Sequence, residues 1–247
     1  IWLRSAAFNL WFYGFTVLVA LASVPLLLLP PAVTRWVAYV WSRGVLGGLW
    51  ICGITVRVTG RENIPPGPAL IASQHQSAMD TIVWFHLVPE VTYVLKAELN
   101  RIPIYGAISR RLNMIAVDRK AGAQAMRVLF RGADEAIAAG RQIVIFPEGS
   151  RAAPGTVLPL HPGVAGLASR TGLPVIPVAT DSGRHWGRRA FRRLPGVIRI
   201  DIRPPLPARL PRAELLHRLA AIYAQGPVDN SVGEGESPLT AHPRNIG

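Results

Sequence analysis

The stretch ALIASQHQSAMD at residues 69–80 decides the fold. Its first four residues are a short apolar run, which predicts a buried strand. Apolar residues resume at 81–87 and predict a helix. A strand that leads directly into a helix is the repeating unit of α/β proteins, and the connecting loop lies at the sheet edge where such proteins bind ligands.

His75 and Asp80 are the two residues of this stretch that can carry chemistry. Positions five apart on an ideal helix are about 140° apart, so they meet only if His75 lies in the loop and Asp80 in the first helical turn. Asp80 would then accept the imidazole N–H and leave the other ring nitrogen as a general base. The alternative is an ordinary helix start that contains a histidine.

Strand-like and helix-like segments alternate over residues 54–225, which predicts an α/β domain with a largely parallel central sheet flanked by helices. The predicted strands are 54–59, 69–72, 92–95, 114–117, 142–146, 174–179 and 197–203. The predicted helices are 81–87, 102–111, 123–139, 164–170 and 211–224.

The first 53 residues are apolar and predict a membrane-associated helical pair in front of this domain. Residues 10–29 carry no charge and are long enough to cross a bilayer as a helix. Residues 36–54 are a second apolar segment that Arg43 interrupts, so a crossing and insertion into one leaflet both fit. A signal peptide is the alternative, because residues 20–22 resemble a cleavage site, although an apolar run follows it.

Composition adds limits to these predictions. A net charge of +13 favours an anionic membrane face, a phosphate-bearing substrate or nucleic acid as partner. One cysteine excludes an intramolecular disulfide. Residues 226–247 are rich in Gly, Pro, Ser and Asn and predict a flexible tail.

A second loop, Pro147-Glu148-Gly149-Ser150-Arg151, follows the predicted strand 142–146. If the strands are parallel, this loop and His75 lie at the same sheet edge. Gly149 allows the backbone to approach a ligand closely, and Arg151 can bind phosphate bidentately. Glu148 would accept a substrate hydroxyl or organise Arg151. The alternative is a turn with a surface salt bridge.

Two more cations, Lys96 and Arg119, follow predicted strands and are candidate phosphate ligands, with solvated strand ends as the alternative. The histidines and the cysteine show no metal-site spacing, so we expect no metal. No glycine-rich nucleotide loop is present. Ser77 is a possible nucleophile, but no G-x-S-x-G motif surrounds it.

Together these motifs resemble the glycerolipid acyltransferase family, in particular its bacterial 1-acyl-glycerol-3-phosphate acyltransferase type. HQSAMD at 75–80 resembles the H-x-x-x-x-D motif, and FPEGSR at 146–151 resembles F-P-E-G-[ST]-R. Residues 102–119 resemble the intervening block, and VIPV at 175–178 resembles the last one. The resemblance covers about residues 55–205. This sequence departs from the pattern at Gln74, where Asn is usual, and at His161, where Lys is common.

The resemblance implies a membrane enzyme that moves an acyl group from acyl-CoA or acyl carrier protein to the sn-2 hydroxyl of 1-acyl-glycerol-3-phosphate, giving phosphatidic acid. His75 would be the base, oriented by Asp80. The substrate would be bound by Lys96, Arg119, Glu148, Gly149, Ser150 and Arg151. No cofactor and no nucleic-acid partner are expected. The expected location is the bacterial inner membrane, with residues 54–225 on the cytoplasmic side.

Three other functions fit parts of the sequence. If the acceptor were another lysolipid, such as a lyso-aminolipid, replacement of Arg119 would matter little, because no phosphate would need to be neutralised. A lipid serine hydrolase would require Ser77. A non-catalytic adaptor would use the basic, aromatic segment 184–193 to bind a membrane surface or nucleic acid.

Overall fold

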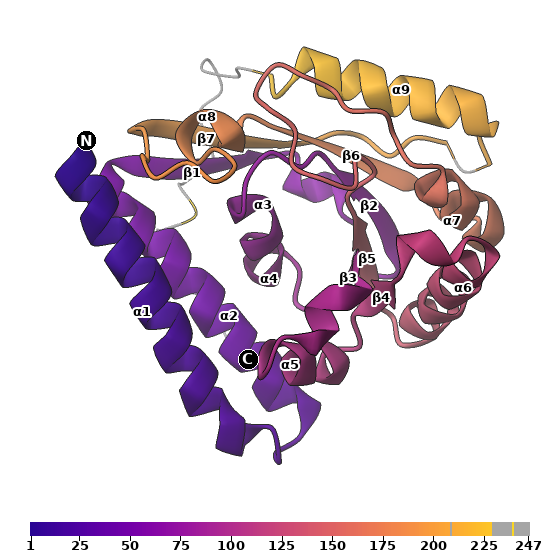
Figure 1. Cartoon of the computed structure of the whole chain (residues 1–247). Coiled ribbons are helices and arrows are strands. Elements are labelled where there is room, and N and C mark those ends of the chain that lie inside the picture. Colours follow the sequence, from indigo (N-terminus) through magenta and orange to yellow (C-terminus); the bar gives the residue numbers. More distant parts are fainter. Residues whose placement is uncertain (208, 229–238, 240–247) are drawn as a thin grey trace.

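The computed structural model describes residues 1–207, 209–228 and 239. A seven-stranded sheet, in the order β1-β7-β6-β2-β5-β3-β4, forms its centre (Figure 1). The strands are β1 (Ile54–Thr59), β2 (Ala69–Ser73), β3 (Val91–Lys96), β4 (Ile115–Val117), β5 (Gln142–Ile145), β6 (Val175–Thr180) and β7 (Gly196–Ile202). The helices are α1 (Trp2–Leu26), α2 (Pro31–Gly48), α3 (Met79–Ile82), α4 (Trp84–Leu87), α5 (Tyr105–Arg111), α6 (Ala123–Ala138), α7 (Gly163–Thr171), α8 (Ser182–His185) and α9 (Arg212–Gln225).

The sheet is mostly parallel, which confirms the predicted fold class. β2 lies in the middle and pairs in parallel with β5 and with β6. β7 is antiparallel to β6, and β1 is parallel to β7, so these two outer strands run against the rest. Hydrophobic periodicity locates a strand but carries no information about its direction, so this reversal was not predictable from the pattern.

Helices cover both faces of the sheet: α6, α7 and α9 on one side and the segment from α1 to α4 on the other (Figure 1). The side chains of β2 alternate between the two cores. Leu70 and Ala72 belong to the core that contains α6, α7 and α9, whereas Ala69 and Ile71 belong to the other. Burial on both faces explains why β2 is a continuous apolar run rather than an alternating one.

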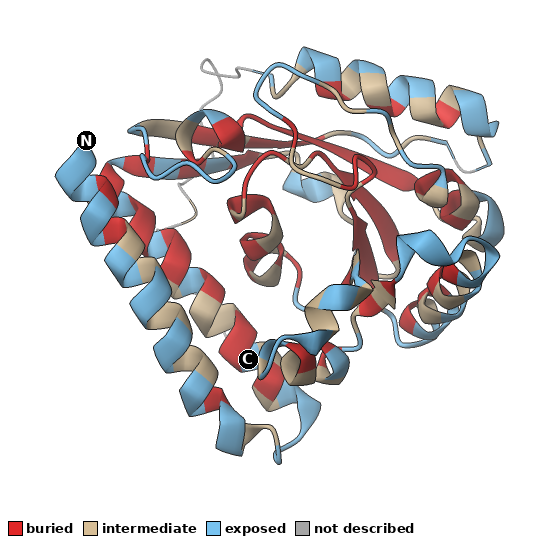
Figure 2. Ribbon diagram, in the orientation of Figure 1, coloured by how far each residue is buried: buried red, intermediate tan, exposed pale blue. Residues whose placement is uncertain are grey.

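The predicted N-terminal helical pair is present as α1 and α2, which pack together. α1 begins at Trp2, before the predicted start at Leu10, and α2 ends at Gly48. α1 is long and apolar enough to cross a membrane, and only 11% of its apolar window is buried in the protein. The outward side of α1 is accordingly mostly exposed (Figure 2). Pro25 and Pro31 flank the turn between the two helices.

The helical pair also shares a hydrophobic core with the sheet. Phe8 of α1 and Val45 of α2 belong to the same buried cluster as Ile71 of β2. The Ser42 hydroxyl of α2 donates a 2.7 Å hydrogen bond to the Ile82 carbonyl at the end of α3. α2 therefore supports the short helices that follow the β2 loop. The predicted tail, 226–247, lies mainly outside the described residues.

Candidate active site

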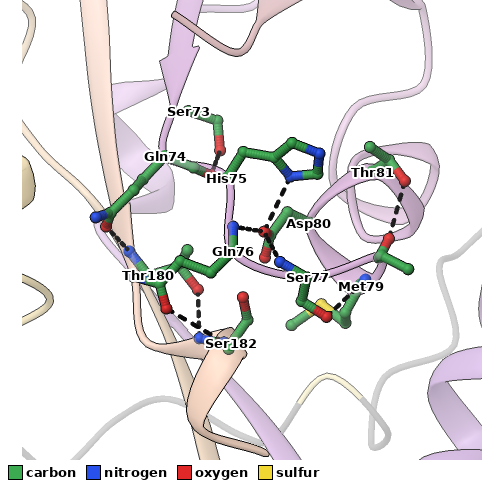
Figure 3. A network of polar contacts seen from close by, with 12 residues as sticks. Ser73, Gln74, His75, Gln76, Ser77, Met79, Asp80, Thr81, Thr180 and Ser182 are labelled. Atoms are coloured by element: carbon green, nitrogen blue, oxygen red, sulfur yellow. Dashed lines mark hydrogen bonds and ion pairs between the residues drawn. The ribbon is translucent and has the colours of Figure 1, made fainter. Parts of the chain in front are cut away.

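The loop between β2 and α3 brings His75 and Asp80 together (Figure 3). β2 ends at Ser73, and Asp80 is the second residue of α3. Asp80 Oδ2 lies 3.2 Å from His75 Nδ1 and also accepts hydrogen bonds from the backbone N–H groups of Gln76, at 2.6 Å, and Ser77, at 2.7 Å. One buried carboxylate oxygen therefore shapes the loop and holds the imidazole.

This contact selects the tautomer of His75. A carboxylate can only accept, so the Nδ1 position carries the proton that faces Asp80. The other ring nitrogen points away from Asp80 in Figure 3 and is the acceptor in the neutral imidazole. The His75 side chain retains 15% exposure, whereas Asp80 retains 2%. His75 is therefore placed to accept a proton from a bound molecule.

A cavity of about 390 Å³ opens at His75. Its apolar wall comes from α2, α4, β3 and α5, and includes Trp41, Phe85, Tyr93, Tyr105, Ile108 and Leu112. Phe146 packs against the imidazole with the ring centroids 4.5 Å apart. An apolar chain can therefore lie in the cavity with its polar end at His75.

The predicted phosphate ligands lie around the same cavity. Lys96, Arg119, Gly149, Ser150 and Arg151 all contribute to its wall. Arg119 Nη1 donates a 2.6 Å hydrogen bond to the Gly149 carbonyl, which ties the end of β4 to the loop after β5. Burial lowers the pKa of Arg119, and the Glu98 carboxylate partly opposes this shift. Several cations thus line a largely apolar cavity.

Gly149 has a specific reason to be glycine. Its φ is +65°, in the left-handed region that favours glycine. A Cβ at this position would also run into the Arg119 guanidinium and the His161 ring. Gly149 therefore lets Arg119 and the loop approach each other closely.

Glu148 lies behind the loop, in contrast to the predicted contact with substrate. It is 3% exposed and is not among the described residues that line the cavity. Its carboxylate accepts hydrogen bonds from the backbone N–H of His75, at 2.8 Å, and of Leu158, at 3.3 Å. Burial raises the pKa of Glu148, and these two N–H groups counteract part of the shift. In this structure Glu148 positions the His75 loop.

Ser77 and Gln74 also have structural partners. Ser77 is fully buried, and its hydroxyl accepts a 3.1 Å hydrogen bond from the Met79 N–H at the start of α3. The Gln74 side chain accepts from the Thr180 N–H of β6 and donates to the Tyr223 carbonyl of α9. Neither side chain is among the described residues of the cavity wall.

Arg188 also lines the cavity, from the segment between α8 and β7, and was not among the predicted site residues. The only available signal was the cluster of arginines in that segment, because no predicted strand ends there.

No group of three or more His, Cys, Asp and Glu side chains could hold a metal ion in the described part of the chain.

Comparison with known proteins places this geometry in context. The sequence profile of the Acyltransferase family matches residues 55–181. A 1-acyl-sn-glycerol-3-phosphate acyltransferase of Pseudomonas aeruginosa is 34% identical over 178 residues, which are 70% of this chain and 68% of that protein. One of Limnanthes douglasii is 30% identical over 66% of this chain and 59% of its own length.

A solved structure has the same fold. The crystal structure of the 1-acyl-sn-glycerophosphate acyltransferase from Thermotoga maritima superposes with a TM-score of 0.69 at 24% identity, over 90% of this chain and 94% of that one. The profile match holds the His75–Asp80 pair, Arg119 and the loop 147–151. On the strength of that match and of the Pseudomonas relative, this chain belongs to the Acyltransferase family.

Proposed function

We propose that this chain transfers a fatty acyl group from acyl-CoA or acyl carrier protein to the sn-2 hydroxyl of 1-acyl-glycerol-3-phosphate, forming phosphatidic acid. The observation that carries the proposal is the position of the His75–Asp80 pair, at a cavity whose largely apolar wall also holds several cations. An acyl chain would bury its apolar surface against the wall, and a phosphate would accept charge-assisted hydrogen bonds from the arginines. The named relatives make the same substrate the first candidate.

In the proposed reaction, His75 Nε2 takes the proton of the acceptor hydroxyl as its oxygen attacks the thioester carbonyl carbon. The Asp80 carboxylate stabilises the imidazolium that forms. The tetrahedral intermediate then collapses, the carbon–sulfur bond breaks, and the imidazolium returns the proton to the departing sulfur. The products are an ester and a free thiol, and no protein nucleophile is needed. Arg119, Arg151 and Lys96, which all line the cavity, neutralise the acceptor phosphate.

The apolar N-terminus supports a membrane location. The exposed side of α1 would lie in lipid, and residues 54–225 would act at the bilayer surface, where the lysolipid and the product reside. Arg4 lies near the start of α1, and Arg57 and Arg61 follow α2. The Cys52 thiol donates to the Arg4 carbonyl, so both ends of the helical pair, with these arginines, lie on the side of the sheet. The positive-inside rule then puts the active site on the cytoplasmic side of a bacterial inner membrane.

An acyl-transfer assay tests the proposal. Purified protein is incubated with a labelled acyl thioester and a panel of lysolipids, and the products are identified by mass. We expect phosphatidic acid from 1-acyl-glycerol-3-phosphate, and loss of at least about a hundredfold in kcat for His75→Ala. Ser77→Ala is the matched control, because a serine hydrolase would need that hydroxyl, whereas direct transfer would not.

Two results would contradict the proposal. Substantial acyl transfer by His75→Ala would show that His75 is not the general base. A preference for a lyso-aminolipid, with Arg119→Ala as active as the wild type, would show that the acceptor carries no phosphate.

A further inference from the structure

A second cavity, of about 400 Å³, lies between α1 and the segment from Trp186 to Arg193. We call it the arginine cavity, because Arg151, Arg189 and Arg193 line it. Arg151 also lines the cavity at His75, so the two cavities are neighbours. Ala78 of the catalytic loop faces the arginine cavity as well. The loop that holds His75 therefore lies next to both.

The arginine cavity has positive charge without a matching negative one. No Asp or Glu is among the described residues that line it. Arg193 is only 5% exposed, and its nearest fixed partners are neutral: Nη2 donates to Asn9 Oδ1 at 2.9 Å, and Nη1 donates to the Ala190 and Phe191 carbonyls. Its buried Nε has no hydrogen-bond partner in the described structure. A buried cation without a carboxylate favours an anionic ligand.

Aromatic rings complete the site. Tyr13 and Phe191 line the arginine cavity and are 63% and 49% exposed. Phe191 also stacks on Trp2, with the ring centroids 5.5 Å apart. Trp186 packs beneath Arg193, whose guanidinium carbon lies 4.9 Å from the ring centroid. Guanidinium groups bind phosphate, and aromatic rings stack on bases. This combination fits a phosphorylated nucleotide better than a simple lipid headgroup.

We infer that the arginine cavity binds the adenine nucleotide of acyl-CoA, with the pantetheine arm passing Arg151 to bring the thioester to His75. The inference rests on the proposed function and names acyl-CoA as its donor. The acceptor phosphate has Arg119, Arg151 and Lys96 at the first cavity, whereas Arg189 and Arg193 line only the arginine cavity and are available for the donor.

The kinetic test uses Arg189→Ala in the full chain, because Arg189 is exposed and its loss removes no packed core atom. We expect the KM for acyl-CoA to rise about tenfold, the loss typical of one charge-assisted hydrogen bond. The KM for the lysolipid is expected to stay constant. The value of kcat/KM with acyl-pantetheine, a donor that lacks the nucleotide, is also expected to stay constant. Arg184→Ala is the matched control, since this exposed arginine of the same region is absent from the residues that line either cavity.

A binding test is independent of acyl transfer. Adenosine 3′,5′-bisphosphate, titrated calorimetrically into the detergent-solubilised protein, is expected to bind the wild type and Arg184→Ala equally and Arg189→Ala about tenfold more weakly. This result would support the nucleotide site even if the acceptor proposed above were wrong.

Three outcomes would overturn the inference. The first is equal affinity of the wild type and Arg189→Ala for the bisphosphate. The second is use of acyl carrier protein with no activity on acyl-CoA. The third is weaker binding of Arg189→Ala to phosphatidylglycerol vesicles with an unchanged KM for acyl-CoA, which would make the cavity a lipid headgroup site.

Discussion

Asp80 Oδ2 performs two tasks with one atom, because it fixes the loop through two backbone N–H groups and the imidazole through a third contact. The backbone bonds need only an acceptor, which an amide oxygen also supplies. Stabilisation of the imidazolium needs the negative charge. The two tasks can therefore be separated by substitution.

We expect Asp80→Asn to keep the loop and lose most of the catalysis. The Asn carbonyl oxygen can still accept from Gln76 and Ser77, whereas the imidazolium loses its counter-charge. A fall in kcat of about 10²- to 10⁴-fold is expected, measured at saturating substrate. The thermal unfolding midpoint serves as the control for the fold. A kcat close to the wild-type value would show that Asp80 is only a loop cap.

Gly149→Ala is expected to displace Arg119 and raise the KM for the lysolipid at least tenfold, the effect of losing one charged phosphate contact. A Cβ here would meet the Arg119 guanidinium, and the positive φ adds about 1–2 kcal/mol of backbone strain. Gly155→Ala is the matched control, because Gly155 also has positive φ, +77°, but nothing within 4 Å of its Cβ position. Equal KM values for the two variants would show that backbone strain alone, without displacement of Arg119, changes the KM for the lysolipid.

At the scale of elements, the site depends on β2 and β5 being parallel neighbours. This pairing puts the His75 loop beside the loop 147–151, where the Ala152 N–H donates to the His75 carbonyl at 2.7 Å. The placement was predictable, because each apolar run ends in a polar motif and parallel strands share a carboxyl edge.

The inward turn of Glu148 was not predictable, because it depends on the backbone N–H of Leu158, ten residues along the chain. Nor was the position of Arg188, which the antiparallel pairing of β6 and β7 brings back over the cavity. Both depend on long-range contacts that leave no trace in local periodicity. The predicted helix 81–87 is helical but divided, since α3 ends at Ile82 and α4 begins at Trp84, and both pack on α2.

Glu148, which links these loops, gives the protein a pH-dependent stability. Its pKa is raised in the folded state above an ordinary value of 4.5. Between the two values the folded state binds more protons than the unfolded state, so the free energy of unfolding falls as pH rises through this window. We expect Glu148→Gln, which does not titrate, to lack this decline. Unfolding midpoints of both proteins, measured from acidic to neutral pH in one detergent, test the difference, and parallel curves would contradict it.

At the scale of the whole molecule, the N-terminal helices include the long apolar helix α1 and are also part of the core. Leu49 is fully buried in the cluster that includes Ile54 of β1 and Ile198 of β7. Trp41 of α2 reaches the cavity at His75. In the membrane location proposed above, packing rather than a flexible linker would set the distance between the bilayer and the active site.

Deletion of residues 1–53 tests whether the two predicted regions are independent. We expect the remaining chain to lose cooperative unfolding, because the deletion exposes the core face that α1 and α2 cover, including the side chains that pack against Val45 and Leu49. Circular dichroism during heating, with the full chain as reference, measures this. Refolding the truncated chain with a peptide of residues 1–53 in lipid micelles is expected to restore the transition. A sharp transition of the truncated chain alone, with acyl transfer to a soluble short-chain acceptor, would show instead that residues 54–225 fold by themselves and that the helices serve only as an anchor.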